Sequence, residues 1–219
     1  MIASIDKVYS YIVAQDNGYS PNPFWGVLSL PWCKPTMRTA IAKYNINNPN
    51  HTLWLVGLTR KDKTGHNRVL YLAQISEILS HHDYFFRYPQ KQPKLEPNLP
   101  HIFQVGDNVY QKDAQSTFTH KAIPSVHSND EAMKKRDLSS PHVLLSFRYV
   151  YYGKQAPVLP ENLQELTVGQ GFKSNFSEEL RASLQQYIDE LNLTENLILA
   201  PPHIWPDQDD SWQQTTKIL

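Results

Sequence analysis

Two apolar runs set the architecture of this chain: Leu53-Trp54-Leu55-Val56-Gly57-Leu58 and Val69-Leu70-Tyr71-Leu72-Ala73-Gln74-Ile75-Ser76-Glu77-Ile78. Both are rich in β-branched, aromatic and other apolar residues, which favours extended strands. Lys61-Asp62-Lys63-Thr64-Gly65-His66-Asn67 lies between them and has the composition of a polar turn. The two runs are therefore predicted to pair as a β-hairpin with a long loop.

Further elements follow from local pattern. Residues 9–14 are predicted to form a strand, and a short extended piece is expected near residues 25–30. Residues 143–152 are predicted to be the longest strand, placed centrally in a sheet because apolar residues occur on both of its faces. Residues 81–88 are short, aromatic and compatible with a helix, whereas the polar and charged residues 129–141 are expected to form a surface loop.

Two helices are predicted. Pro35 suits the first turn of a helix that runs to about residue 44. The clearer helix begins near Asn175 or Ser177, either of which can cap it, and the acidic residues that follow favour the positive end of its dipole. One apolar face at helical spacing is formed by Leu180, Leu184, Tyr187, Ile188 and Leu191.

Short strands thus dominate until a C-terminal helix. This order predicts an α+β fold with a curled, mostly antiparallel sheet or a small barrel and flanking helices. We expect one domain over residues 1–219, with a core at about 8–192. Four prolines make residues 89–100 an extended or looped insertion, and residues 200–219 form a Pro-rich, acidic tail that wraps the surface or frays.

Composition limits the possible functions. The chain has 219 residues, 40% of them hydrophobic, and 21 basic residues balance 21 acidic ones. A neutral chain is a poor match for a protein that grips duplex DNA through its phosphates, which requires a basic face. One cysteine excludes an internal disulfide and suits the cytoplasm. No apolar run approaches the roughly 20 residues of a membrane span, so a cytoplasmic protein without a membrane partner is expected.

The segment 14–38 concentrates chemically active side chains on a loop shaped by prolines and glycines. Asp16 and Asn22 have two open interpretations. Asx residues beside Gly and Pro make turns by bonding to their own backbone. Alternatively, the carboxylate and the amide can read the edge of a nucleobase.

Cations and aromatic residues follow in the same segment. Lys34 and Arg38 are four residues apart and share a helix face, which is either a phosphate site or simply a solvated surface. Trp25 and Trp32 are candidates for stacking on a base, whereas Trp54 belongs to a strand and is expected in the core.

Catalytic and metal chemistry has weaker support. Cys33 is either a nucleophile activated by nearby cations or a small buried residue. His127 is a possible base for it, or a structural histidine with satisfied hydrogen bonds. The remaining histidines lack metal-ligand spacing, so neither a metal nor a cofactor is expected.

The order of these motifs resembles the second type of nucleotide-modification-associated domain. The residues concerned are Asp16-Asn17-Gly18, Pro21-Asn22-Pro23-Phe24, Gly26, Cys33-Lys34-Pro35, Arg38, Trp54 to Gly57, Tyr71 to Ile75, Tyr84, Gly106-Asp107-Asn108-Val109-Tyr110, Ser125 to Ser128 and Tyr151-Tyr152-Gly153. The resemblance covers roughly residues 9–176. It implies a role in phage or bacterial systems that handle modified nucleotides, and it implies no particular reaction.

The hairpin with a following Asp83-Tyr84 is also similar to PUA-like domains, including the EVE and ASCH groups. This similarity implies a small curled barrel that holds a base in an aromatic and polar pocket. A shared fold does not by itself assign a function.

The favoured hypothesis is a protein that binds a modified nucleobase, a nucleotide or a short nucleic acid. Its pocket would use Asn22, Trp25 and Trp32 as a wall with Asp16 as the hinge, and Lys34 and Arg38 for phosphate; Tyr71, His127 and Tyr151 would complete it. The first alternative is an enzyme that uses Cys33 or His127 on the same ligands, and the second is a protein–protein interaction module. The identity of the ligand and the oligomeric state are left open.

Overall fold

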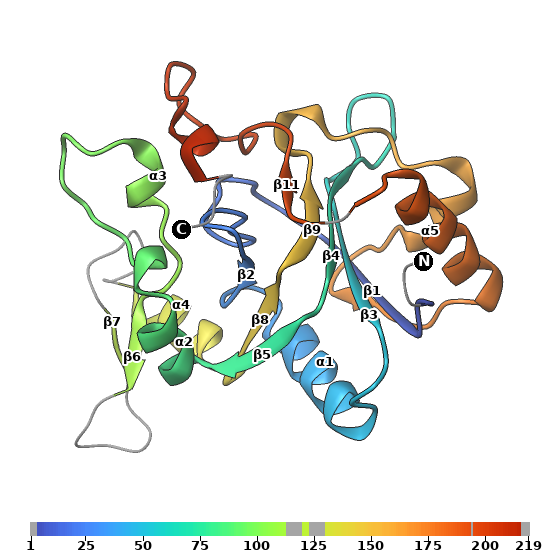
Figure 1. Ribbon diagram of the computed structural model, residues 1–219, viewed down its shortest axis with the longest axis horizontal. Helices are drawn as coiled ribbons and strands as arrows, with labels where there is room; N and C mark the ends of the chain where they lie inside the picture. Colours follow the sequence, from blue (N-terminus) through green and yellow to red (C-terminus); the bar gives the residue numbers. More distant parts are fainter. Residues whose placement is uncertain (1–3, 113–119, 123–129, 194, 216–219) are drawn as a thin grey trace.

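The computed structural model describes residues 4–112, 120–122, 130–193 and 195–215. These residues form a mixed α+β fold with sheets of six, three and two strands (Figure 1). In spatial order, the six-stranded sheet contains β10 (Phe172–Lys173), β1 (Lys7–Ile12), β3 (Leu53–Leu58), β4 (Val69–Gln74), β9 (Arg148–Tyr151) and β11 (Leu197–Ile198). Because β10 and β11 are separate edges, the sheet is open, and the predicted alternative of a PUA-like barrel is wrong.

The predicted hairpin lies at the centre of this sheet. β3 and β4 pair antiparallel, with Trp54 opposite Gln74 and Gly57 opposite Tyr71. A Cβ atom at Gly57 would lie 2.0 Å from the Tyr71 ring, so only glycine allows this ring to cross the neighbouring strand. By contrast, β1 pairs parallel with β3, which places the carboxyl ends of both strands at one edge of the sheet.

The two longest predicted strands each divide between two sheets. The segment 69–78 ends β4 at Gln74 and continues as β5 at Glu77, while the segment 143–152 is interrupted between Ser146 and Arg148. The corner is held by the Ser76 amide, which donates to the Leu145 carbonyl at 2.9 Å. The second sheet consists of β2 (Leu28–Leu30), β8 (His142–Ser146) and β5 (Glu77–Ser80). The prediction of one continuous strand in each segment is therefore wrong. Side-chain alternation gives no sign of the corner, because it continues through both strands of a segment.

Strand alternation divides the core between the two faces of the large sheet. Apart from Val69 and Leu70 beside the register shift in β4, odd-numbered residues of the central strands, including Tyr71 and Tyr151, pack with Met37 and Ile41 of α1. Even-numbered residues, including Trp54, face the opposite way and pack against α5. Trp54 is therefore a core residue, as predicted.

The two predicted helices are confirmed. α1 (Pro35–Asn47) has Pro35 in its first turn. α5 (Glu178–Glu190) is capped by Ser177, whose hydroxyl accepts from the Leu180 amide at 3.1 Å. α5 lies at the right of Figure 1, away from the second sheet. The remaining elements are α2 (His81–Arg87), the 3₁₀ helix η1 (Pro89–Lys91), α3 (His101–Gln104), β6 (Tyr110–Lys112), β7 (His120–Ala122), α4 (Glu131–Asp137), η2 (Gly153–Gln155), η3 (Glu161–Leu166) and η4 (Ser211–Thr215).

α4 corrects the predicted surface loop over residues 129–141. Asp130 caps this helix by accepting from the Met133 amide at 2.9 Å, and basic residues occupy its last turn. Cap, first-turn acid and last-turn bases are the ordinary signals of a helix, and they were outweighed by the overall polarity of the segment.

The C-terminal tail is docked on the body of the protein. The ring of Trp205 is 5% exposed and lies 5.2 Å, centroid to centroid, from Phe24 of the N-terminal loop. The Ile204 amide also donates to the Asp16 carbonyl at 2.8 Å. The tail thus joins the N-terminal loop in the tertiary structure. Among the residues described, no helix is long and apolar enough to cross a membrane.

Candidate functional site

A pocket that we call the main pocket opens where the parallel strands β1 and β3 end. It has a volume of about 310 Å³. Its walls are the loop after β1, Cys33 and Lys34 before α1, Arg60 after β3, and the helix α4. In α/β sheets, ligands bind at the carboxyl ends of parallel strands, because loops from both strands meet there. The lining consists of Tyr11, Ile12, Val13, Ala14, Gln15, Asn17, Tyr19, Ser20, Trp32, Cys33, Lys34, Arg60, Met133, Arg136 and Asp137.

Two stacked rings form the aromatic wall of this pocket. Tyr19 and Trp32 have ring centroids 6.0 Å apart and an interplanar angle of 18°. Trp32 is buried against Val109 and Tyr110, whereas Tyr19 is half-buried. Trp32 therefore supports Tyr19 from behind and leaves the Tyr19 ring as the outer member of the stack.

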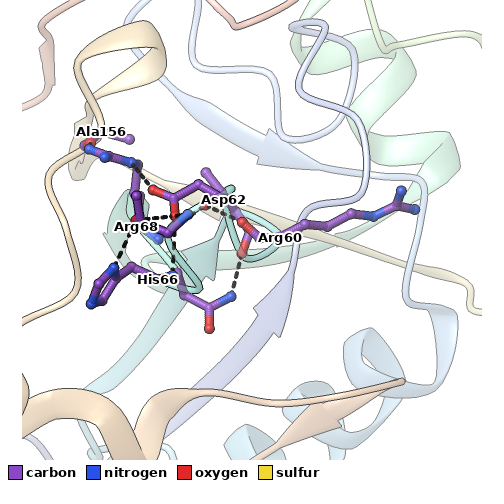
Figure 2. Close-up of polar contacts among 8 residues, drawn as sticks. Arg60, Asp62, His66, Arg68 and Ala156 are labelled. Carbon is purple, nitrogen blue, oxygen red and sulfur yellow. Dashed lines mark hydrogen bonds and ion pairs between the residues drawn. The ribbon is translucent and has the colours of Figure 1, made fainter.

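Cations surround the aromatic wall. The Lys34 ammonium donates to the Gly171 carbonyl at 3.0 Å and lies 5.7 Å from the centroid of the Tyr11 ring. Arg136 keeps 55% of its side chain exposed beside the buried Asp137. Arg60 is exposed just after β3. Figure 2 shows its side chain extending away from the neighbouring cluster in which Asp62 binds Arg68. Three cations against one carboxylate make the lining positive although the chain as a whole is neutral.

The backbone at this site is bent unfavourably. Cys33 and Lys34 are consecutive non-glycine residues in the left-handed region, with φ values of 50° and 43°. Such conformations are uncommon, cost free energy and concentrate at functional sites. Arg38 braces the bend, since its Nε donates to the Cys33 carbonyl at 3.0 Å.

Cys33 lines the pocket as a partly buried thiol. Burial, and then the charge of Asp137, raise its pKa, against the opposing effects of Arg136, Arg38 and Lys34. The thiol is therefore protonated at neutral pH, which disfavours it as a nucleophile. Its predicted partner His127 lies outside the described residues.

Arg38 is placed inside the protein. Its side chain is fully buried, and its guanidinium donates to the carbonyls of Cys33, Asp137, Ser140 and His142. Burial lowers the pKa of this guanidinium to about 10. The head group of Lys34 is directed instead to Gly171, so the two basic groups do not converge on one ligand position.

Asn22 is also fully buried, within a polar cluster behind the N-terminal loop. Its Oδ1 accepts from the Phe24 amide at 3.1 Å, which is the turn-making contact expected of an Asx residue, and from Lys91 Nζ at 2.9 Å. Ser29 accepts from Lys91 at 2.8 Å and donates to Asp107 at 2.5 Å. We call Asn22, Ser29, Tyr84, Lys91 and Asp107 the closed cluster.

The closed cluster holds an ammonium and a carboxylate in the protein interior, joined through the Ser29 hydroxyl, which accepts from Lys91 and donates to Asp107. Tyr84 donates to the second oxygen of Asp107 at 2.6 Å, so both carboxylate oxygens have donors. Burial lowers the pKa of Lys91 to about 8, and burial raises the pKa of Asp107. Lys91 belongs to the Pro-rich segment 89–100, which is thus anchored to the core at this point.

Trp25 lies apart from the main pocket. Its ring packs edge-on against Phe24 and at 6.4 Å from Phe103, centroid to centroid, and the ammonium of Lys91 lies 6.0 Å from it. The structure thus brings Trp32 and Lys34 together with Cys33, and it leaves Trp25 with the closed cluster.

Asp16, Tyr71 and Tyr151 form a third group. Tyr151 donates to Asp16 Oδ1, and Tyr71 donates to the Tyr11 hydroxyl at 2.8 Å. Asp16 also binds His203 of the tail, whose Nδ1 lies 2.9 Å from Asp16 Oδ2. Both tyrosines are buried, so their hydroxyls support the floor beneath the loop after β1.

Sequence reasoning did not identify five residues of these sites. They are Tyr11, Tyr19, Arg60, Arg136 and His203. Arg60 had one detectable signal in the sequence, which is its position just after the strand β3. Asp16 likewise follows β1, the parallel neighbour of β3. Arg136 and His203 gave no local signal, since they lie 102 or more positions along the chain from Lys34. Within the described ranges, no three His, Cys, Asp or Glu side chains group to hold a metal ion.

The fold and this pocket define a mixed α+β protein with an aromatic, positively charged pocket at the ends of two parallel strands. The sequence model of the family described as nucleotide modification associated domain 2 matches residues 5–208. The chain therefore belongs to that family, which agrees with the resemblance found in its motifs. No curated protein and no solved structure shows significant similarity to the chain.

Proposed function

We propose that the main pocket binds a single nucleotide, with its base on Tyr19 and its phosphate among Lys34, Arg60 and Arg136. The observation that carries this proposal is the position of the stacked Tyr19–Trp32 pair beside three cations in one pocket. Stacking on an aromatic side chain contributes roughly 1–3 kcal/mol per base, and arginine forks match phosphate oxygens.

The size and charge of the pocket favour a nucleotide over a long duplex. A volume of about 310 Å³ is at the lower end of the range for small-molecule sites and suits one nucleotide. The lining carries three cations, whereas the chain as a whole has no net positive charge with which to bind many phosphates.

Polar groups next to the aromatic wall suit the recognition of a modified base. Gln15, Asn17 and Ser20 line the pocket beside Tyr19, and an amide can present a donor and an acceptor to a base substituent. Together with membership of the nucleotide-modification family, this lining supports a reader of modified nucleotides in phage or bacterial systems. The protonated state of Cys33 favours binding over thiolate catalysis.

Calorimetric titration with mononucleotides, their base-methylated forms and short single strands tests this proposal. We expect Arg60→Gln and Arg136→Gln each to weaken nucleotide binding by roughly tenfold, since a hydrogen bond to a charged group contributes about 1.5–3 kcal/mol. Lys61→Gln and Lys135→Gln remove the same charge one residue away, outside the main pocket, and serve as matched controls.

The aromatic wall is tested by Tyr19→Ala, which should also weaken binding by roughly tenfold. Phe86→Ala, at an aromatic residue that is 57% exposed and outside the pocket lining, is the control. Absence of binding to every ligand in the series, or equal losses in the site and control variants, would overturn the proposed function.

A further inference from the structure

A second hollow adjoins the main pocket. It has a volume of about 340 Å³, and it shares Val13, Ala14, Gln15 and Arg60 with the main pocket. Its other lining residues are Asp16, Thr59, Asp62, Arg68, Leu70, His203 and Ile204. A ligand whose base occupies the main pocket can therefore extend past Arg60 into this hollow.

His203 is held in this hollow by a buried carboxylate. Asp16 is 7% exposed, and its Oδ2 accepts from both the backbone amide and Nδ1 of His203, each at 2.9 Å. Tyr151 donates to the other oxygen and fixes the carboxylate from behind. A carboxylate bonded to Nδ1 selects the tautomer with its proton there, which leaves the lone pair on Nε2.

Nε2 of His203 remains available. The His203 side chain is 40% exposed, and Nε2 has no hydrogen-bond partner within the described part of the chain. An exposed imidazole oriented by a buried carboxylate is the arrangement of a general base. The backbone amide of His203 already anchors the tail to Asp16, so the additional bond to Nδ1 sets the orientation of the ring.

The cations of the hollow differ in their availability. Arg68 is engaged by Asp62 at 3.1 Å and by the Ala156 carbonyl at 3.2 Å, as Figure 2 shows. The Arg60 side chain extends away from that cluster and lines both hollows. Arg60 is thus the cation placed to hold phosphate between the base site and His203.

We propose that His203, positioned by Asp16, is the general base for hydrolysis of a phosphoanhydride bond in the bound nucleotide. This inference rests on the proposed function of the main pocket. In the step, Nε2 takes one proton from water while the water oxygen bonds to phosphorus. The bond from that phosphorus to the bridging oxygen breaks, and its electron pair stays on the bridging oxygen, which departs as part of the phosphate leaving group. The imidazolium then returns its proton to solvent.

A phosphoanhydride is the bond class that this site suits. Its leaving group is a phosphate whose conjugate acid has a pKa near 6–7, so it departs as an anion and needs no protein acid. Arg60 stabilises the negative charge that develops, as arginine does in phosphoryl transfer generally. Among the described residues that line the second hollow, His203 is the one histidine, which matches a reaction that requires a base alone.

The test measures phosphate release from the magnesium complexes of the four deoxynucleoside triphosphates and of 5-methyl-dCTP. His203→Asn is the decisive variant, because the asparagine amide occupies the position of Nδ1 and keeps the bond to Asp16 while Nε2 is lost. We expect kcat to fall by about 100-fold or more, with the dissociation constant of the nucleotide unchanged. His51→Asn is the matched control, since the Nδ1 of His51 also has a partner, Tyr44, at 2.9 Å.

Asp16→Asn tests the positioning role. It should lower kcat by at least tenfold and leave KM within about twofold. The wrong imidazole tautomer impairs His203 as a general base, whereas the main pocket that binds the nucleobase is unchanged. Denaturation midpoints within a few degrees of the wild type would establish that both variants keep their fold. A rise in KM with kcat unchanged would contradict the positioning role of Asp16.

The outcomes separate the two proposals. Nucleotide binding without phosphate release would overturn the role of His203 and leave the binding function intact. Release that is equal in the wild type and His203→Asn would also overturn it. Absence of both binding and release would overturn the proposed function and this inference together.

Discussion

The N-terminal loop contributes polar residues to two regions with opposite surroundings. In the closed cluster, Lys91 and Asp107 are buried and each has at least two hydrogen-bond partners. In the main pocket, Lys34 keeps one backbone partner, Arg60 is exposed, and Arg136 is exposed although it pairs with Asp137 at 3.6 Å. The same kinds of charged group therefore stabilise the fold in one region and remain available to a ligand in the other.

Desolvation accounts for this difference. A buried charge is tolerated only when partners replace its water, so the closed cluster cannot release Lys91 or Asn22 to a ligand without a large cost. A half-exposed cation keeps water, which a phosphate can displace. Asn22 was a reasonable candidate by residue type, yet its burial commits it to the loop and to Lys91.

The largest expected effect separates the two regions by stability. Lys91→Met should lower the free energy of unfolding by about 3–5 kcal/mol, because it leaves Asp107 buried without its cation. Lys34→Met, the same substitution in the main pocket, should cost about 1 kcal/mol or less. Urea denaturation at pH 7 measures both. Equal losses in the two variants would contradict the contrast between the regions.

A pH dependence sharpens the same contrast. Burial, and then the charge of Asp107, raise the pKa of Tyr84 well above 10. Above pH 10 the unfolded tyrosine loses its proton while the folded one keeps it, so its contribution to stability decreases as pH rises. We expect the advantage of the wild type over Tyr84→Phe to shrink by about 1.4 kcal/mol per pH unit above pH 10.

The matched measurement uses Tyr19→Phe in the main pocket. Burial also raises the pKa of Tyr19, but its ring is half-buried and water screens the effect. The difference in free energy of unfolding between the wild type and Tyr19→Phe should decrease with a smaller slope over the same pH range. Denaturation series at pH 10, 10.5 and 11 give both slopes, and a steeper slope for Tyr19 would be the contrary result.

The smallest expected effect concerns the rate of modification of Cys33. Because burial and Asp137 raise its pKa, iodoacetamide should react with this thiol at pH 8 more slowly than with free cysteine. Arg136→Gln removes a charge that opposes this shift and should slow the reaction further, whereas Lys135→Gln should not. A bound nucleotide should protect the thiol; alkylation faster than that of free cysteine would restore Cys33 as a candidate nucleophile.

Some elements were predictable because their signals are local. The hairpin of β3 and β4, the proline at the start of α1 and the serine cap of α5 all follow from residues within a few positions of one another. The helix α4 was missed although its cap was readable. The corners at residues 75–76 and 147 were not readable, because a strand that changes sheets keeps its side-chain alternation.

The candidate site was predictable only in part. Trp32, Cys33 and Lys34 are adjacent in sequence and stay together in the main pocket. Arg38 shares their segment, yet the first turn of α1 directs its guanidinium into the protein. Three of its four hydrogen bonds go to carbonyls at least 99 positions away along the chain. Residue type and spacing cannot distinguish a buried guanidinium from one that faces a ligand.

By itself, the sequence determined the fold class, the central strands, both longer helices and membership of the nucleotide-modification family, since these depend on periodicity and motif order. Only the tertiary structure decided which polar groups are buried and which face a pocket. Asp16 and His203 lie 187 positions apart and meet because the tail docks on the N-terminal loop. Burial and such long-range contacts arise from packing of the whole chain, and no local pattern encodes them.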